Sequence, residues 1–208
     1  RRLAEEVIES KKFALLDYEK SLNVDMADKD LLFSSEHIFS LRNQAIKTGA
    51  EAIHKRVTGS DGNLQMAVGF QSSIYEGDLD DYRLNWYSEI YIVKYTSDNS
   101  KRFFPKVPII RLSEMYLIAA EASGDIRYLE TLRANRGYAT DPLPAGANLQ
   151  DEITKEYQKE FIAEGQLFYY YKRRNMAILP ITSTSMNRAT YVLPVPDNEL
   201  EFGNFKQN

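Results

Sequence analysis

The clearest pattern of apolar and polar positions lies between residues 107 and 137. Apolar residues recur there at intervals of three and four, as on one face of an α-helix, at Leu112, Met115, Tyr116, Ala119 and Ala122. Gly124 then indicates a helix end, because glycine readily adopts the left-handed backbone that terminates many helices. Asp125 is a favourable N-cap for a second helix. The pattern predicts two helices, over 111–123 and from Asp125 to Gly137, joined by a tight turn.

Further elements follow from the same periodicity. Helices are predicted at residues 1–12, 45–57, about 151–164 and 166–175. In the third of these, Ile153, Tyr157 and Phe161 fall on one stripe, so this face is expected to be buried. The segment HIFSLRN, residues 37–43, predicts a buried strand. The tail YVLPVPDNELEFGNFKQN contains Pro194 and Pro196, which disfavour a helix and predict an extended segment.

Residues 74–105 have a different pattern. A turn at GDLDD is followed by aromatic and β-branched residues, which predicts a small β-hairpin or an irregular β-region. Strand side chains alternate between two faces. Tyr87 and Tyr91 would then share one face, and Tyr82 and Trp86 the other. One face is expected in the core, while the other could present an aromatic platform to a ligand.

Composition narrows the classes of function. The chain has 208 residues, a net charge of −4 and 43% hydrophobic residues, which is typical of a globular protein and unlike a nucleic-acid-binding domain. Cysteine is absent, which excludes a thiol nucleophile, a disulfide framework and a cysteine-based metal site. No apolar run is long enough to span a bilayer. Fourteen tyrosines and ten phenylalanines accompany a single tryptophan, and most of these rings are expected in the core.

Carboxylates gather in the segment SIYEGDLDDYR at Glu76, Asp78, Asp80 and Asp81. Alternating carboxylates can hold calcium, but this cluster lacks the twelve-residue loop of an EF-hand. The sequence instead predicts a turn in which one aspartate pairs with Arg83. His37 and His54 have no second metal ligand at a regular spacing. We therefore expect neither a metal site nor a bound cofactor.

Two groups of charges are predicted to be structural. Arg111 and Glu114 lie three residues apart and can pair on a helix, with Glu121 on the same side. Paired carboxylates could suggest acid–base chemistry, but an ion pair that locks the helix pair is the expected role. The run 172–174, KRR, follows an aromatic cluster. It is expected at a helix C-terminus, where positive charge is favoured, rather than at a nucleic-acid interface.

Eight segments, in chain order, resemble the C-terminal half of the SusD/RagB family of outer-membrane nutrient-binding lipoproteins. The segments are AEEVIESKKF (4–13), LFSSEHIFSL (32–41), SIYEGDLDDYR (73–83), YIVKY (91–95), PIIRLSEMYLIAAEA (108–122), YLETLRANRG (128–137), ITKEYQKEFIAEGQLFYYYKR (153–173) and YVLPVPDNELEFG (191–203). The resemblance implies a mainly α fold of tetratricopeptide-like helix pairs, with an irregular loop-rich region and a small β-hairpin. Residues 1–208 would form the C-terminal part of the domain. The N-terminal half, with its signal peptide, lipid-bearing cysteine and first helical repeats, would lie upstream.

The resemblance also implies a function without catalysis. It implies capture of an oligosaccharide at the cell surface and delivery to a SusC-type TonB-dependent outer-membrane transporter. The protein would be an outward-facing outer-membrane lipoprotein of the Bacteroidota, touching the membrane only through a lipid anchor on the N-terminal half. An enzyme would need two carboxylates across a cleft, and the pairs Glu114 with Glu121 or within 76–81 look like helix or turn pairs. A peptide- or protein-binding helical-repeat module in nutrient uptake is the alternative.

Loops supply the ligand contacts in this family, and their residues differ between members, so no binding residue can be carried over by motif. The segments of this chain that most resemble those loops are 45–75 and 76–90. Aromatic rings pack against the apolar faces of sugars, and a few polar groups fix the orientation. On this chemistry, the candidate ligand-binding residues are His54, Phe70, Tyr75, Tyr82, Trp86 and Tyr87.

Overall fold

The computed structural model describes most of the chain as two compact units, Arg1–Glu164 and Gly165–Asn208. The described residues are 1–25, 28–43, 45, 69–88, 91–95, 106–138, 142–180, 182–192, 195–196, 201 and 203. The first unit begins with α1 (Arg2–Glu9), α2 (Tyr18–Ser21), the 3-10 turn η2 (Ser34–Glu36) and β1 (His37–Arg42). It continues with α4 (Phe70–Tyr75), the 3-10 helix η3 (Tyr82–Trp86), β2 (Tyr87–Ser88), β3 (Tyr91–Ile92) and β4 (Lys106–Arg111). It ends with α5 (Leu112–Ser123), α6 (Ile126–Arg133), the π-helical turn η4 (Ala134–Tyr138) and α7 (Leu149–Glu160). The second unit contains α8 (Leu167–Arg173) and α9 (Arg188–Tyr191).

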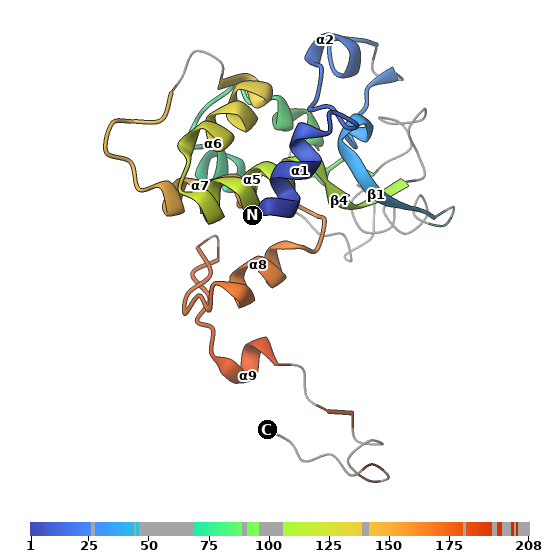
Figure 1. Ribbon diagram of the computed structural model, residues 1–208. Helices are drawn as coiled ribbons and strands as arrows, with labels where there is room; N and C mark the ends of the chain where they lie inside the picture. The colour runs from blue at the N-terminus through green and yellow to red at the C-terminus, as the bar shows by residue number, and fades with distance from the viewer. Residues whose placement is uncertain are drawn as a thin grey trace. The chain divides into compact units, whose positions relative to one another are not determined.

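Helices form most of the regular structure in the described residues, so the fold is mainly α, as the sequence predicts. Helix α5 is the centre of the first unit, because it contacts α1, α6 and α7. Figure 1 shows these four helices side by side, with the β1–β4 pair beyond α1. Within the described residues, no helix is long and apolar enough to cross a membrane.

The predicted helix pair is present as α5 and α6. Gly124 ends α5 in the left-handed conformation, with φ of 73°. The Asp125 side chain accepts a hydrogen bond from the backbone N–H of Arg127 at 3.0 Å and so caps α6. Leu129 and Leu132 of α6 are fully buried, and this apolar contact holds the pair together.

The buried face of α5 differs in part from the predicted stripe. Leu112, Leu117, Ala119 and Ala120 are buried, whereas Ala122 is exposed. The physical reason is that α5 packs against helices on more than one side, so burial is not confined to one stripe. Small residues at 119 and 120 permit the close approach of neighbouring helices.

The helix predicted over residues 1–12 is present as the shorter α1, which packs on α5. Ala4 is buried in that contact, and the hydroxyl of Tyr128 donates a hydrogen bond to Glu5 Oε1 at 3.1 Å. Leu3 lies on another side of the helix and is 69% exposed. Helix α1 therefore belongs to the helical layer but does not bury all of its apolar side chains.

Strand β1 was predicted correctly, but the expectation that it is buried was wrong. It pairs only with β4 among the described strands, in an antiparallel register that places Leu41 opposite Val107. Phe39 and Leu41 are each 50% exposed, because a two-stranded sheet has little to cover its outer face. The sequence did not predict β4, since Pro108 interrupts its pattern and a strong helix follows directly.

The predicted β-region contains a smaller hairpin than expected. Strands β2 and β3 pair through Tyr87 with Ile92 and Ser88 with Tyr91. Residues 82–86 form the 3-10 helix η3 instead of a strand, so the predicted alternation of Tyr82 and Trp86 against Tyr87 and Tyr91 was wrong. The cause is local, because the Asp81 side chain accepts the backbone N–H of Arg83 and starts a helical turn.

The second unit begins at Gly165, which adopts a left-handed φ of 76°. Helix α8 follows as predicted, with Lys172 and Arg173 in its last turn, where the helix dipole favours positive charge. The hydroxyl of Tyr191 in α9 donates to the carbonyl of Met176 at 2.9 Å. The predicted extended tail and the predicted helix at 45–57 fall mostly on residues outside the described ranges.

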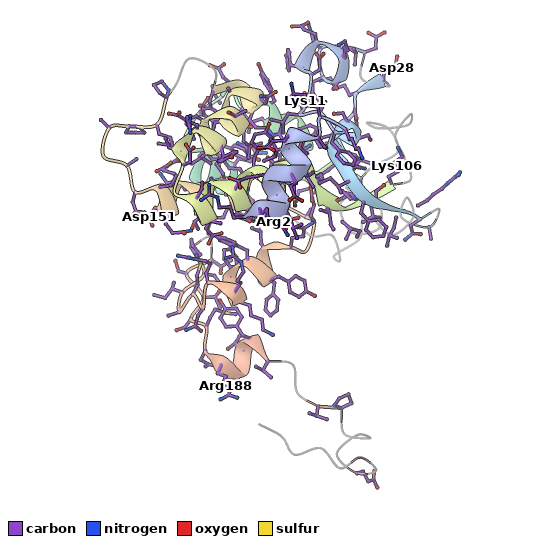
Figure 2. All side chains as sticks on the ribbon, viewed as in Figure 1. Arg2, Lys11, Asp28, Lys106, Asp151 and Arg188 are labelled. Atoms are coloured by element: carbon purple, nitrogen blue, oxygen red, sulfur yellow. The ribbon has the colours of Figure 1, made fainter. Side chains whose placement is uncertain are left out.

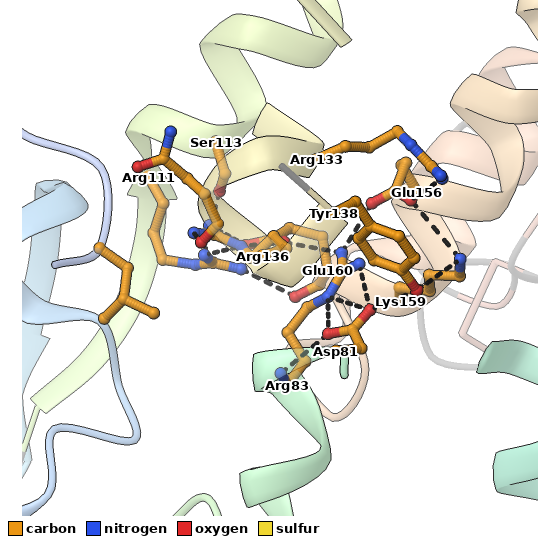
Figure 3. A network of polar contacts seen from close by, with 12 residues as sticks. Asp81, Arg83, Arg111, Ser113, Arg133, Arg136, Tyr138, Glu156, Lys159 and Glu160 are labelled. Carbon is orange, nitrogen blue, oxygen red and sulfur yellow. Dashed lines mark hydrogen bonds and ion pairs between the residues drawn. The ribbon is translucent and has the colours of Figure 1, made fainter. Parts of the chain in front are cut away.

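Charged side chains occupy both the surface and the core of the first unit. Arg2, Lys11, Lys106 and Asp151 lie on its outside (Figure 2). A second set is buried at the centre and forms one network of hydrogen bonds and ion pairs (Figure 3). The buried network consists of Glu36, Asp81, Arg83, Lys94, Arg111, Arg133, Arg136, Glu156, Lys159, Glu160 and Glu164.

Glu160 of α7 is the hub of the buried network. Its carboxylate accepts hydrogen bonds from Arg111 at 2.6 Å, from Arg136 at 2.8 Å and from Arg83 at 3.1 Å. Burial alone would raise the pKa of the Glu160 carboxyl, but the charges of Arg136 and Arg111 outweigh it and hold that pKa well below 4.5. The carboxylate is therefore ionised, and each buried charge has a partner.

Arg111 was predicted to pair with Glu114 and so lock the helix pair. Its role is structural, but the carboxylates that the structure places at its guanidinium belong to other elements. The residue is the N-cap of α5, and its guanidinium is fully buried. Besides Glu160, it reaches Glu164 at 2.9 Å and Glu36 at 3.4 Å. These carboxylates belong to other parts of the chain, so Arg111 ties α5 to α7 and η2.

Candidate functional site

A pocket of about 700 Å³ lies beside η3 in the first unit. This is within the usual size range of ligand pockets, roughly 300–1,000 Å³. We call it the η3 pocket. Its lining residues are Tyr18, Lys29, Leu79, Asp80, Asp81, Tyr82, Leu84, Asn85, Tyr87, Ser88, Val93 and Gly137.

The turn between α4 and η3 shapes one wall of the η3 pocket. Glu76 and Gly77 both adopt a positive φ, of 56° and 81°, which ends α4 and reverses the chain. The Asp78 side chain then accepts the backbone N–H of Asp80 at 2.8 Å. This turn places Leu79 at the surface with 86% of its side chain exposed.

Two tyrosines from distant parts of the chain stack at the η3 pocket. Tyr18 begins α2 and Tyr82 begins η3, and their ring centroids are 4.3 Å apart with an angle of 27° between the planes. Both rings are partly exposed. Asp17 caps α2 by accepting the backbone N–H of Lys20, which orients the first turn that carries Tyr18. Both rings belong to the lining of the pocket.

Polar groups lie next to this aromatic pair. Lys29 Nζ donates to Asn85 Oδ1 at 2.7 Å, and Asn85 Nδ2 donates to the carbonyl of Tyr82 at 2.9 Å. These bonds fix the Asn85 amide beside Tyr82 and hold a positive charge at the pocket. The arrangement joins a stacking surface to a few oriented polar groups, which is how pockets usually combine affinity with specificity.

A smaller pocket of about 280 Å³ adjoins the same segment. We call it the α4 pocket. Its lining residues are Gln71, Ser72, Tyr75, Gly77, Asp78, Leu79, Leu84 and Tyr87. Leu79, Leu84 and Tyr87 also line the η3 pocket, so these three side chains form a shared wall.

Tyr87 is held firmly in that shared wall. Its ring packs edge-on against Tyr75 with centroids 5.8 Å apart, and the two hydroxyls are 3.2 Å apart. Burial raises the pKa of the Tyr87 hydroxyl to about 12, so the hydroxyl stays protonated at neutral pH. A protonated hydroxyl can both donate and accept hydrogen bonds.

The buried network supports the pocket wall from behind. Arg83 lies between the lining residues Tyr82 and Leu84, and its own side chain is fully buried. Its Nη2 bonds Asp81 at 2.6 Å, as predicted for an aspartate of the turn, and its Nη1 bonds Glu156 of α7 at 2.8 Å. The helical scaffold thus fixes the position of η3, and with it Tyr82.

The structure assigns Trp86 to the core rather than to a platform. Its side chain is fully buried, packs against Phe33 with centroids 5.0 Å apart, and has Lys94 Nζ 3.7 Å above its ring. Lys94 also pairs with Glu164. Burial lowers the pKa of the Lys94 ammonium to about 8 despite the attraction of that carboxylate. The ring faces of Trp86 are therefore occupied by protein groups.

The other candidate residues differ in their placement. Tyr82 and Tyr87 line the η3 pocket, while Tyr75 is buried and reaches only the α4 pocket. Phe70 begins α4, half-buried, and is not part of either lining. His54 lies outside the described residues.

Among the lining residues that sequence reasoning missed are Tyr18, Lys29 and Asn85. Tyr18 and Lys29 precede β1 and reach the pocket only through the tertiary fold, so no local spacing could indicate them. Asn85 lies within 76–90, a segment that resembles the family's binding loops. Its place at the pocket depends on residues 82–86 forming the 3-10 helix η3 rather than a strand.

Two carboxylates of this segment, Asp81 and Glu76, have cationic partners in the fold. Glu76 pairs with Lys155 at 2.8 Å and with Lys159 at 3.6 Å. Burial raises the pKa of the Glu76 carboxyl, but the hydrogen bond from Lys155 and the charge of Lys159 outweigh it, so the net shift is downward. In the part of the chain that the structure describes, no group of three or more acidic or histidine side chains could hold a metal ion.

Comparisons with known proteins identify the fold. The sequence matches no protein-family model and no curated protein. Among solved structures, the chain is similar to a SusD superfamily protein from Bacteroides thetaiotaomicron, with a TM-score of 0.73 and 25% identity over 100% of this chain and 55% of that one. It is also similar to surface glycan-binding protein A from Bacteroides thetaiotaomicron, in complex with laminarihexaose, with a TM-score of 0.66 and 17% identity over 100% of this chain and 58% of that one. The chain thus spans little more than half the length of each.

Proposed function

We propose that this chain, whose fold is SusD-like over its whole length, contributes the binding site of a non-enzymatic glycan-binding protein. The stacked pair of Tyr18 and Tyr82 at the η3 pocket is the observation that carries the proposal. A sugar ring has faces rich in C–H groups, which pack favourably on such rings. Asn85 and Lys29 lie beside the pair and would bond the hydroxyls.

The ion pairs of Asp81 and Glu76 support binding rather than bond cleavage. Glycoside hydrolysis uses two carboxyl groups across the scissile bond, one of them able to deliver a proton. Asp81 is fully engaged by Arg83, and Glu76 is paired with Lys155. These partners give both groups a structural role in the fold.

The family resemblance supports the wider setting of the proposal. In that setting, the protein delivers its glycan to a SusC-type TonB-dependent transporter. A lipid anchor holds it on the outer face of the outer membrane. Binding of the glycan can be tested by itself, without the anchor or the transporter.

A glycan array probed with the full chain, followed by calorimetric titration of the sugars that bind, tests the proposal. Laminarihexaose is the first soluble probe, because a protein of the same fold was solved with it. We expect saturable binding of at least one oligosaccharide and no new reducing ends after long incubation. Binding of a peptide pool without any glycan would favour the peptide-uptake alternative and contradict the proposal. Release of reducing ends would contradict its non-enzymatic part.

A further inference from the structure

We propose that the η3 pocket and the α4 pocket are two subsites for one linear oligosaccharide, whose chain crosses the shared wall at Leu79. This inference rests on the proposed glycan binding and adds the length of ligand that the site recognises. It predicts that the site selects oligosaccharides long enough to reach both pockets over single sugars and disaccharides.

The shared wall is the first observation. The two pockets share the lining residues Leu79, Leu84 and Tyr87, so these three side chains form the boundary between the pockets. A ligand that leaves one pocket over this wall enters the other directly. The volumes of about 700 and 280 Å³ also differ, which suits a longer segment of the ligand in the η3 pocket and a shorter one in the α4 pocket.

The exposure of Leu79 is the second observation. Its side chain is 86% exposed, between the acidic residues Asp78 and Asp80. A single exposed leucine is ordinary on a protein surface. This leucine, however, stands at the boundary of two pockets, where the C–H face of a sugar unit would cover it and remove its apolar surface from water.

The chemistry of the α4 pocket is the third observation. Gln71 and Ser72 of α4 and Asp78 of the turn supply amide, hydroxyl and carboxylate groups to its lining. These groups recognise hydroxyls, as Asn85 would do in the η3 pocket. Tyr87 is fixed between the pockets by its contacts with Tyr75, so the wall keeps its shape when a ligand binds.

Titration of a length series into the full chain tests the two-subsite proposal. The probes are the laminari-series disaccharide, trisaccharide, tetrasaccharide and hexasaccharide, or the same lengths of whichever backbone the array selects. We expect the hexasaccharide to bind at least about tenfold more tightly than the disaccharide, a difference of about 1.4 kcal/mol. Equal affinity for all lengths in the unmodified protein would overturn the proposal.

Two variants on α4 separate the subsites. Ser72 lines the α4 pocket and Ser73 lines neither pocket, and both side chains are exposed. Ser72→Arg should lower hexasaccharide affinity to the level of the disaccharide and leave the disaccharide unaffected. Ser73→Arg adds the same charge one residue away and should bind both sugars like the unmodified protein. Equal behaviour of the two variants, with both folded by circular dichroism, would overturn the two-subsite proposal. No binding of any glycan would instead reject the proposed function itself.

Discussion

At the residue scale, Glu160 shows how the fold uses buried charge. Three arginines from separate segments, Arg83, Arg111 and Arg136, donate to its carboxylate. A buried ion network of this kind is costly to disrupt, because removal of one partner leaves the others desolvated and uncompensated. Stability at this point therefore depends on the full set of charges rather than on any one pair.

Replacement of Glu160 tests that dependence. Glu160→Gln keeps the shape but removes the negative charge, so we expect a loss of about 3–5 kcal/mol in the free energy of unfolding, measured with urea. Glu6→Gln is the matched control, since Glu6 forms an exposed pair with Arg2. That change should alter stability by less than about 0.5 kcal/mol. Equal urea midpoints for the two variants would contradict the structural role of the network.

The same carboxyl predicts a pH dependence. Its pKa in the folded state lies well below the unfolded value of 4.5, because Arg136 and Arg111 favour the charged form over the opposing effect of burial. The stability it contributes is present above pH 4.5 and is lost as pH falls below 4.5 toward the folded-state pKa. The gap in unfolding free energy between the unmodified protein and Glu160→Gln should therefore shrink as pH falls below 4.5. A gap that stays constant or widens there would show that the carboxyl is not held ionised by its partners.

Contacts between charged side chains were predictable from the sequence only where the two residues are close along the chain. The pairing of an aspartate with Arg83 was predictable, because Asp81 lies two residues away. The contact of Arg136 with Glu36 was not, since it depends on tertiary packing. Trp86 illustrates the same limit, because composition cannot distinguish a buried ring from an exposed one. Trp86→Ala would remove a core residue at a cost of about 3–5 kcal/mol and would be a poor probe of binding.

At the element scale, the turn before η3 depends on a close approach to Gly137. A Cβ at position 137 would lie 2.2 Å from the carbonyl oxygen of Asp80, and the backbone there has a φ of 110°. Gly137 also lines the η3 pocket. This glycine therefore allows η4 to pack against the segment that carries Tyr82.

Gly137→Ala should displace that segment. We expect a loss of at least about 2 kcal/mol in unfolding free energy, from backbone strain and from the clash, together with weaker glycan binding. Gly146→Ala is the matched control, because Gly146 has a φ of 83° but nothing within 4 Å of its added Cβ. The control should lose only about 1 kcal/mol and bind normally. If Gly137→Ala were no less stable than Gly146→Ala, the close approach to Asp80 would not be a constraint.

Periodicity predicted the strong helices but not the short elements. Helix α5 ends at Gly124, α6 and α7 are capped by Asp125 and Asn148, and the sequence indicated all three helices. The two-residue strands and η3 are shorter than the window over which periodicity can be measured. The candidate pocket is built from these short elements, which is why the site was harder to predict than the scaffold.

At the scale of the whole molecule, the fold and the η3 pocket required different kinds of information. Eight ordered segments indicated a SusD-like fold, and the solved structures confirm it over the full chain. The η3 pocket, by contrast, joins Tyr18, Lys29, the segment 79–88 and Gly137 from distant parts of the first unit. No single segment contains that set, so only the folded structure could bring it together.

The central claim is that a glycan stacks on the Tyr18–Tyr82 pair, and calorimetry with Tyr82→Ala tests it most directly. Tyr128→Ala is the control, because Tyr128 forms another aromatic pair, with Tyr116, away from both pocket linings. With a glycan that binds the unmodified protein, Tyr82→Ala should lose at least about tenfold in affinity, or about 1.4 kcal/mol, while Tyr128→Ala keeps it. Unchanged affinity in a folded Tyr82→Ala protein would contradict the account and exclude the η3 pocket as the glycan site.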